Sequence, residues 1–558
     1  MKRLLFFVLI FVLAIQSPAQ QKTQSSAPYS GSELDRPRLV VGIVVDQMRY
    51  DFLYRYWNRF GKGGFQRMVR EGYSFANCNF NYFQTKTGPG HASIYTGTTP
   101  AMHGIVGNDW HEVAESRNLY CTQDDSVTGI GSNDKAGRMS PKNMKTGSVG
   151  DQIRLATNFR GKSFGISMKD RGSILPAGHG ADAAFWFEKS SGNFISSTWY
   201  TKLNGKLPAW LEKFNQEKWA ARYKDSIWKP LLDPSKYEAS SADDQIWERS
   251  ILPSKSPTFP YRLSESEKKD FEIVYDTPFG NTITAIATKE LVKGEKLGKD
   301  EFMDFLALSF SCTDAVGHDY GPFAMETEDT YLRLDRDLED FFRFLDLEVG
   351  QGKYLCFLSA DHGILETPAF LRQNRIPSIT FNSNSIADSL KNFALQQFGS
   401  SALISSFRNL QFYFNQAEIK RLNLDRNKIM QSLIPYLEKQ KSVWRVFANE
   451  GIKPFPAIPM MYKYEAGFYK GRSGDIQVVL APGVLESGGN KGTNHGAPYS
   501  YDSHVPCLWM GWKIQHGEEI TPINIEDIAP TLSSLLHIME PNGSTGKAQS
   551  IPLKTSWK

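Results

Sequence analysis

The sequence predicts a doubly wound α/β fold with a mostly parallel central sheet and helices on both faces. Three apolar runs, Leu39–Val45, Phe305–Ser311 and Tyr354–Ala360, are each followed closely by an aspartate. Continuous apolar runs of this length are typical of strands buried on both faces of a sheet. A helical pattern over residues 326–346 lies between the second and third runs, as a right-handed crossover between parallel strands requires.

The sequence predicts two further elements of the core and two insertions. Residues 65–71 have the composition of a short helix, and the apolar run 164–168 has that of another strand. The Trp- and Lys-rich region near 193–268 lacks the alternation of strand and helix and is predicted to be an insertion. Residues 401–464, mostly helical in pattern, form the second predicted insertion. We expect one catalytic domain over residues 37–545 and a C-terminal tail over 546–558.

The N-terminus has the pattern of a cleaved secretory signal. Lys2 and Arg3 precede an apolar run, Leu4–Ile15, which is too short to span a bilayer and ends near the small residues Ser17-Pro18-Ala19. We expect a signal peptide over residues 1–19, a flexible leader over 20–36, no membrane span after cleavage, and a periplasmic or secreted protein. An N-terminal anchor is the less favoured alternative, because the apolar run is short.

The composition excludes some classes of function. A net charge of +4 on 558 residues, without a block of Lys or Arg, does not indicate a nucleic-acid-binding surface. The five cysteines form no CxxC motif, so a thiolate zinc site is disfavoured. Cys78 and Cys121 can pair in an oxidising compartment, but the sequence does not decide whether they do. Any metal is expected to be bound by oxygen and nitrogen.

Carboxylates and imidazoles follow the predicted strands. In open α/β sheets ligands bind beyond the carboxyl ends of the strands, so Asp46, Asp314 and Asp361 are expected at one edge. Imidazoles accompany them: His318 belongs to a DxxxH motif with Asp314, His362 adjoins Asp361, and a glycine-containing loop carries His495. This mixture of nitrogen and oxygen ligands suits two Zn²⁺ ions better than Ca²⁺ or Mg²⁺.

A hydroxyl that this metal site could activate lies in the segment TKTGPGHASIYTG, residues 85–97. Pro89 is suited to a first helical turn, which places Thr87 just ahead of a helix N-terminus. Free backbone N–H groups and the helix dipole favour an anion there. Taken alone, this turn is weak support for an anion site.

Each of these residues also has an ordinary structural interpretation. An aspartate after a strand is commonly a turn former or a helix cap, and a single histidine is more often structural than a ligand. The joint placement of the chosen residues at strand ends is what favours function. Seven other histidines are interpreted as structural: His91, His103, His111, His179, His504, His516 and His537.

The order of these motifs resembles that of a known superfamily. Asp46, TKTGPGH, Asn108, DxxxH, DHG and a late histidine follow one another as in the alkaline phosphatase superfamily, and the chain is similar to its PafA-type bacterial members. The similarity runs from about residue 38 to 512, through stretches such as VVGIVVDQMR, SMKDRGSILPAGH and TYLRLDRDL. It includes both segments interpreted as insertions.

This resemblance implies a role for each candidate residue. Asp46, Thr87, Asp361 and His362 would surround one zinc ion, and Asp314, His318 and His495 the other. Thr87 would be the nucleophile and form a phosphothreonine, while Asn108, Lys169 and Arg171 would contact the phosphoryl oxygens. The expected reaction is hydrolysis of small-molecule phosphate monoesters with release of inorganic phosphate.

Four alternatives compete with this expectation. A phosphodiesterase or nucleotide pyrophosphatase on the same fold is the nearest, but Lys169 and Arg171 favour a dianionic monoester. A sulfatase would need a CxPxR-type nucleophile sequence, and a serine hydrolase a GxSxG elbow, and neither motif is present. A non-catalytic binding protein that kept the fold is the remote alternative, since every ligand and the nucleophile are present.

Overall fold

The structure is a computed structural model that describes residues 35–448, 459–486 and 489–554. The chain divides into two units, residues 1–36 and residues 37–558. The predicted signal peptide lies outside the described residues, as does the predicted leader up to residue 34. The description that follows concerns the larger unit.

A ten-stranded sheet forms the centre of this unit. Five adjacent strands are parallel, in the order β13 (Tyr354–Ser359), β1 (Leu39–Val45), β12 (Asp304–Phe310), β7 (Ser163–Ser167) and β8 (Ala183–Glu188). All seven residues of β1 are buried, as expected for a central strand covered on both faces. The predicted fold class is confirmed.

The edges of the sheet are antiparallel. On one side β21 (Cys507–Gly511) pairs with β13, followed by β2 (Tyr73–Phe75) and β22 (Gly517–Glu519). On the other side β9 (Asn193–Ser197) pairs with β8 and is followed by β6 (Gly129–Ile130). The segment predicted as an insertion near 193–268 therefore begins with a strand of the central sheet.

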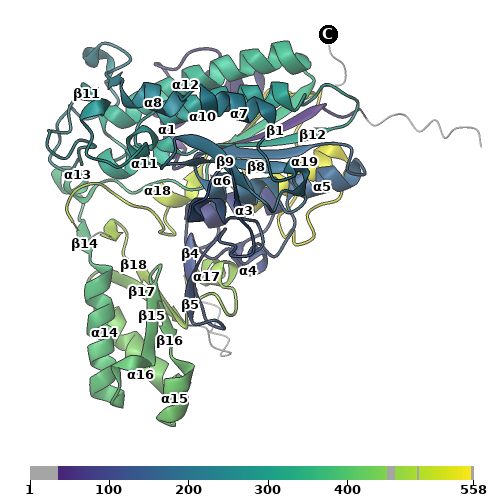
Figure 1. The fold of residues 1–558 in the computed structure, drawn as a ribbon. Helices are drawn as coiled ribbons and strands as arrows, with labels where there is room; N and C mark the ends of the chain where they lie inside the picture. Colours follow the sequence, from purple (N-terminus) through teal and green to yellow (C-terminus); the bar gives the residue numbers. More distant parts are fainter. Residues whose placement is uncertain (1–34, 449–458, 487–488, 555–558) are drawn as a thin grey trace, which may run out of the picture. The chain divides into compact units, whose positions relative to one another are not determined.

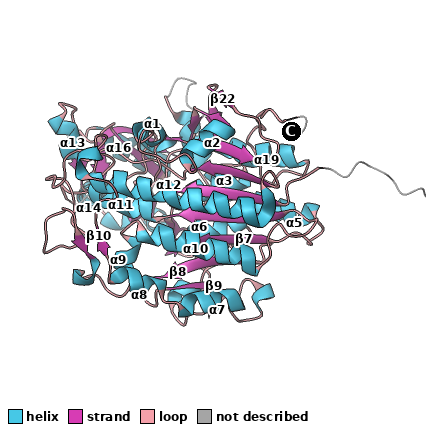
Figure 2. Cartoon of the chain, turned by 90° about the horizontal axis from the view of Figure 1, so that it is seen from above, coloured by secondary structure: helices cyan, strands magenta, loops and turns pink. Residues whose placement is uncertain are grey.

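Helices cover both faces of the sheet (Figures 1 and 2). The crossover from β12 to β13 runs through α11 (Cys312–Tyr320) and α12 (Met325–Leu345), and α12 lies beside α10 (Phe279–Gly294) on one face. The other face is covered by α3 (Thr87–Thr96), α5 (Val149–Ala156), α6 (Asp170–Ala177) and α19 (Ile528–Leu536).

Close contact between α3 and the sheet explains a glycine in the middle of β1. A Cβ at Gly42 would lie 2.6 Å from the ring of Phe357 and 2.7 Å from the hydroxyl of Tyr95. Glycine is unfavourable in a strand unless such close approach requires it. Gly42 therefore lets Tyr95 of α3 pack against the strand that ends at Asp46.

A second, smaller core lies in residues 379–448 and 459–486, called here the four-stranded subdomain. Its sheet has the order β15 (Ile404–Arg408), β16 (Gln411–Phe414), β18 (Ile476–Leu480) and β17 (Val443–Ala448). Two helices, α14 (Ser383–Phe398) and α16 (Arg426–Glu438), supply apolar residues to the core, which includes Leu390, Phe412, Leu433, Ile476 and Val478. The insertion predicted over 401–464 falls within it and contains strands as well as helices.

Other segments of the chain pack on the main body. After β9, residues 209–262 form α7 (Ala209–Gln216), α8 (Trp219–Lys224) and the strand pair β10 (Ile227–Trp228) and β11 (Tyr261–Arg262). In the region predicted as a tail, the backbone N–H groups of Lys547 and Gln549 donate to Asp527 and Thr531, and Ile551 is buried.

The structure shows no disulfide among the five cysteines, which all lie in the described ranges. Each is buried and has a free thiol. The optional pairing of Cys78 with Cys121 is therefore not present. None of the helices in the described ranges combines the length and the apolar character needed to cross a membrane.

Candidate active site

The three predicted aspartates meet at one edge of the sheet because their strands are parallel neighbours. Asp46 follows β1 directly, Asp361 follows β13, and Asp314 lies in the first turn of α11 after β12. All three side chains are buried. Three carboxylates in one water-poor region repel one another and are costly unless cations compensate them.

The first cluster consists of Asp46, Asp361 and His362, whose ligand atoms all lie within 4.8 Å of one another. The Nε2 atom of His362 is 3.5 Å from Asp46 Oδ1 and 3.6 Å from Asp361 Oδ2. Among the described residues, these three buried atoms have no hydrogen-bond partner. Buried polar atoms are normally paired, so three unpaired ligand atoms that face one another fit a bound metal ion.

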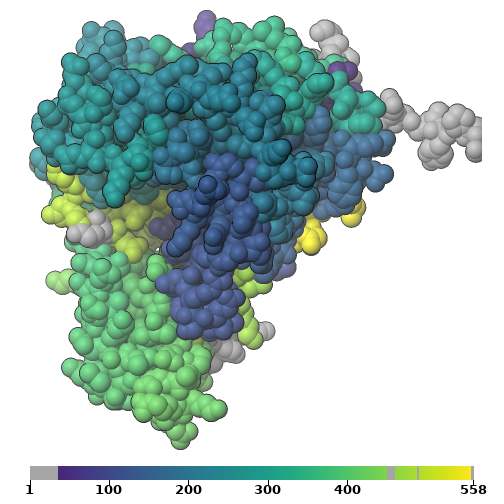
Figure 3. Space-filling model, in the orientation of Figure 1, coloured from purple at the N-terminus to yellow at the C-terminus, as the bar shows by residue number. Residues whose placement is uncertain are grey.

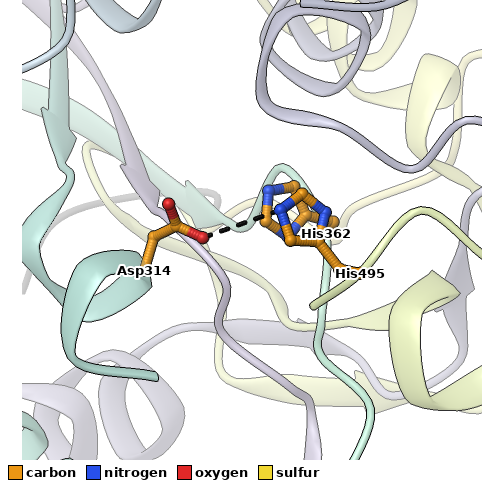
Figure 4. A group of neighbouring side chains, drawn as sticks. All are labelled: Asp314, His362 and His495. Carbon is orange, nitrogen blue, oxygen red and sulfur yellow. Dashed lines mark ion pairs between the residues drawn. The ribbon is translucent and has the colours of Figure 1, made fainter. Parts of the chain in front are cut away.

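The second cluster is Asp314, His362 and His495 (Figure 4). The Nε2 atom of His495 is 3.8 Å from Asp314 Oδ1, and its ring stacks on that of His362 with centroids 3.5 Å apart. His318 also faces this carboxylate, since its Nε2 atom is 3.1 Å from the same oxygen. The structure thus brings His318 to Asp314 as expected, and in addition places His362 within reach of both clusters.

Backbone carbonyls orient the three imidazoles. The Nδ1 atom lies 2.9 Å from the Thr493 carbonyl in His318, 2.9 Å from the Gly363 carbonyl in His362 and 2.7 Å from the Thr85 carbonyl in His495. Because a carbonyl only accepts, Nδ1 carries a proton in each ring, which leaves Nε2 as the atom that would bind a metal. This is the arrangement of metal-binding histidines.

His91 differs from these three histidines although it lies nearby. Its Nδ1 contacts the Thr87 carbonyl and its Nε2 contacts the Ser309 hydroxyl, both at 2.9 Å. Burial lowers the pKa of His91 to about 4. Both ring nitrogens are already in use, which agrees with a structural role.

The charges of the site are strongly coupled. Burial and the neighbouring Asp361 raise the pKa of Asp46 well above its usual range, and burial raises that of Asp361 to about 7. Burial opposes ionisation of Asp314 as well, but His318 and Lys169 outweigh it and hold its pKa well below the usual range. The site therefore favours cations.

Lys169 connects the two clusters. It follows β7, immediately before α6, and its Nζ is 2.6 Å from Asp46 Oδ2 and 2.6 Å from Asp314 Oδ2. Burial opposes the charged form, but the two carboxylates raise the pKa of Lys169, so the ammonium stays charged. Without a family resemblance, this residue would have been interpreted as a solvated strand end, whereas it is buried.

Thr87, Asn108 and Arg171 meet at the start of α3. Thr87 is the first residue of this helix, and Nη2 of Arg171 lies 3.4 Å from its Oγ1. The carbonyl oxygen of the Asn108 side chain accepts a hydrogen bond from the backbone N–H of Gly88 at 2.7 Å. A hydroxyl, an amide and a guanidinium thus face a helix N-terminus, where an anion is favoured.

Two residues of the site were missed in the sequence. The backbone N–H of Gln47 donates to Asp361 and its side-chain amide to Asp314, at 3.1 and 2.5 Å. The Tyr120 hydroxyl accepts from Nη1 of Arg171 at 2.9 Å and donates to Asp170 at 2.8 Å. Gln47 could have been found from its place beside Asp46, whereas nothing in the sequence marks Tyr120.

Comparison with known proteins gives this site a family. A family model described as type I phosphodiesterase / nucleotide pyrophosphatase matches residues 40–502. Alkaline phosphatase PafA of Elizabethkingia meningoseptica is 43% identical over 516 residues, which cover 92% of this chain and 94% of the relative. This chain belongs to the alkaline phosphatase superfamily.

Other relatives and a solved structure agree with this membership. The crystal structure of alkaline phosphatase PafA matches this chain with a TM-score of 0.89 and 42% identity. The match covers 92% of this chain and 98% of the PafA chain. Alkaline phosphatase PhoV of Synechococcus elongatus is 41% identical over 99% of this chain and 100% of its own. A relative from Myroides odoratus, also 41% identical, covers 94% and 96% and bears the name calcium-transporting ATPase.

Proposed function

We propose that this protein is a secreted alkaline phosphatase that hydrolyses phosphate monoesters at two Zn²⁺ ions, with Thr87 as the nucleophile. Alkaline phosphatases 41–43% identical over most of the chain make it a phosphoric monoester hydrolase. The observation that carries the detailed proposal is the Thr87 hydroxyl, which lies at a helix N-terminus, 3.4 Å from Arg171. Buried Asp and His ligand atoms gather at the same strand ends.

Two groups of residues would each bind one metal ion. Asp46, Asp361 and His362, together with Thr87, would hold one ion, and Asp314, His318 and His495 the other. The bound ions supply the positive charge that lowers the pKa of a hydroxyl and stabilises a leaving oxygen in phosphoryl transfer. Gln47 would fix Asp361 and Asp314 through its two hydrogen bonds.

Thr87 performs the covalent chemistry. Its Oγ attacks phosphorus, the bond from phosphorus to the ester oxygen breaks, and the alcohol leaves with that electron pair and gains a proton. Water then attacks phospho-Thr87, which releases inorganic phosphate and restores the hydroxyl. A threonine hydroxyl is a weak nucleophile without activation, so this step would depend on the positive charge of an ion held by Asp46, Asp361 and His362.

Three side chains would bind the non-bridging phosphoryl oxygens. The Gly88 N–H engages the Asn108 oxygen, which leaves the Asn108 NH₂ group as the donor for substrate. Tyr120 holds the Arg171 guanidinium, whose planar fork suits two phosphate oxygens. Lys169 remains charged between Asp46 and Asp314 and adds a second full positive charge. Donors fixed in advance in this way stabilise the charge of the transition state.

Phosphodiester or pyrophosphate hydrolysis is the second candidate, because the matching family model has that description. A diester carries one negative charge on its phosphoryl group and brings a second substituent. Lys169 and Arg171 place two positive charges where a monoester dianion has most to gain from them. The charge at the site therefore favours the monoester. A non-catalytic binding protein is the remote alternative.

Secretion is the remaining part of the proposal. It rests on the pattern Lys2-Arg3, Leu4–Ile15 and Ser17-Pro18-Ala19, typical of a signal peptide over residues 1–19. Mass spectrometry of the protein recovered from the periplasm or medium should give a chain that begins at Gln20. A cell-retained chain that still begins at Met1 would contradict it.

Two rates on the zinc-loaded protein test the activity. One substrate is an aryl phosphate monoester and the other a methyl aryl phosphate diester, each also measured with Lys169→Ala and Arg171→Ala. We expect a large monoester preference that collapses in both variants. A diester preference that neither substitution alters would support the phosphodiesterase, and no hydrolysis of either would support the binding protein.

A further inference from the structure

A turn of the four-stranded subdomain contacts the segment that carries Asn108. The strands β15 and β16 pair Arg408 with Gln411, so Asn409 and Leu410 form a two-residue turn. The Asn409 side-chain amide donates to the Asp109 carbonyl at 2.6 Å. The Gln84 side-chain amide donates to the Asn409 carbonyl at 2.7 Å. In Figures 1 and 3 this part of the subdomain lies against the segment around β4 (Asp109–Glu112).

The conformation of this turn is demanding. Asn409 and Leu410 have φ angles of 51° and 58°. Asparagine tolerates such a φ well, but leucine does so only under strain, and surrounding contacts must hold it there. The Leu410 carbonyl accepts from the Val478 N–H at 2.8 Å and from the Gln477 amide at 3.3 Å. The rest of the subdomain sheet therefore fixes the turn.

The hydrogen bond from Asn409 to Asp109 connects the turn with Asn108 and Arg171, two residues proposed to bind the phosphoryl oxygens. Asp109 adjoins Asn108 and begins β4, where it pairs with Tyr120 of β5 (Arg117–Tyr120). The Asn108 backbone carbonyl also accepts from the Cys121 N–H at 2.9 Å. Tyr120 in turn holds Arg171. A shift of Asp109 would therefore move the amide of Asn108 and the support of Arg171 together.

The fit around the turn is close on both sides. A Cβ at Gly107 would lie only 2.6 Å from the Asn409 amide nitrogen, so the loop before Asn108 packs directly on it. Gln84, which bonds the same turn, is three residues before Thr87. The turn thus bridges the chain segments that lead to the nucleophile and to Asn108.

We propose that Asn409 is a positioning residue for phosphoryl transfer. Through the Asp109 carbonyl it fixes the Asn108 amide and, across the β4–β5 pair, the hydroxyl of Tyr120 that holds Arg171. The four-stranded subdomain then contributes to catalysis without touching the substrate. This inference rests on the proposed function, because it concerns donors to the phosphoryl oxygens.

A matched pair of substitutions tests it. Asn409→Gly removes the amide but keeps a residue that adopts a positive φ without strain. Asn423, which is exposed after α15 (Gln416–Arg421) in the same subdomain, also has a φ of 51°, so Asn423→Gly repeats the backbone change there. We expect kcat/KM for an aryl monoester to fall about tenfold in Asn409→Gly and less than about twofold in Asn423→Gly.

Further readouts separate positioning from simple loss of stability. Inhibition by inorganic phosphate should weaken in Asn409→Gly, while zinc content and melting temperature stay close to wild type. With Asn108→Ala, the loss in the double variant should be smaller than the product of the two single losses. Asn409→Asp keeps the size of the side chain but lacks the NH₂ donor and should lose as much activity as Asn409→Gly.

The outcomes distinguish this inference from the proposed function. If the wild type hydrolyses monoesters and Asn108→Ala impairs it, the proposed function stands and the Asn409 variants decide the inference. Wild-type kcat/KM and phosphate inhibition in Asn409→Gly or Asn409→Asp would overturn it. Asn409→Gly would also overturn it if it lowered kcat/KM by the same factor in the wild type and in Asn108→Ala. An inactive wild type would instead refute the proposed function.

Discussion

The Tyr120 hydroxyl gives the most specific prediction about how the site is held together. It accepts a hydrogen bond from Arg171 at 2.9 Å and donates one to Asp170 at 2.8 Å. Tyr120→Phe removes this single oxygen and leaves the ring, over which the Arg171 guanidinium lies 6.0 Å from the centroid. Arg171 keeps its charge but loses the partner that directs its fork toward Thr87.

The magnitude follows from the type of bond that is lost. A hydrogen bond to a charged group contributes about 1.5–3 kcal/mol. If roughly half of the upper value acts only in the transition state, the loss is about 1.5 kcal/mol, or roughly tenfold in kcat/KM. Complete removal of a transition-state donor lowers kcat about a hundred- to a thousandfold. We expect a loss of this size for Arg171→Ala, and the loss in Tyr120→Phe should not exceed it.

Steady-state kinetics on an aryl phosphate monoester measure the effect. Tyr354→Phe is the matched control, because the buried Tyr354 hydroxyl donates to Asp346 at 2.9 Å at the opposite end of β13 from Asp361. It should keep the wild-type kcat/KM. In an Arg171→Ala background, Tyr120→Phe should cost almost nothing further. A full tenfold loss in that background would refute the reasoning, as would wild-type activity of Tyr120→Phe.

Three further predictions follow from buried groups. Exhaustive chelation should abolish hydrolysis and lower the melting temperature, and added Zn²⁺ should restore both, because Asp46 Oδ1, Asp361 Oδ2 and His362 Nε2 are otherwise left without a partner. A melting temperature indifferent to chelation would contradict the metal site. Burial lowers the pKa of Lys463 from 10.5 to about 8, so the unfolded chain binds more protons between these values, and the cost of burying the charge is relieved as pH rises. The unfolding free energy of the wild type should therefore rise with pH over that range relative to Lys463→Met in denaturant titrations, and a fall would show the opposite sign of shift. Because all five cysteines are free and buried, a reductant should not change the melting temperature, and thiol titration of the denatured protein should find five thiols; fewer than five would indicate a disulfide.

The central fold was predictable because its strands are continuous and apolar. The bounds of β1 agree with the prediction, β12 and α12 are each shifted by one residue, and β13 ends one residue earlier than predicted. These elements are buried on both faces or along one stripe, so their periodicity is clear. The parallel pairing of their strands then places the three aspartates together.

The four-stranded subdomain was not predictable in the same way. Its strands are short and antiparallel, and the helical segments before β15, after β16 and before β17 dominate the pattern. The contact of Asn409 with Asp109 joins residues 300 positions apart. Tertiary packing alone creates such a contact, and neither residue has an unusual neighbourhood in the sequence.

Within the site, residue types were easier to predict than their partners. The family resemblance implied that Asp314, His318 and His495 belong together, and their atoms do lie close. It did not indicate that His362 reaches both clusters or that Lys169 lies between Asp46 and Asp314. Both facts depend on side-chain direction across neighbouring strands, which spacing along the chain does not encode.

The covalent role of Thr87 is the central claim, and trapping the intermediate tests it most directly. The zinc-loaded enzyme is mixed with an aryl phosphate monoester, quenched in acid and mapped by peptide mass spectrometry. The account predicts one phosphoryl group on Thr87 in the wild type, and neither this adduct nor appreciable turnover in Thr87→Ala. A Thr87→Ala enzyme that binds zinc and turns over at the wild-type rate would contradict it.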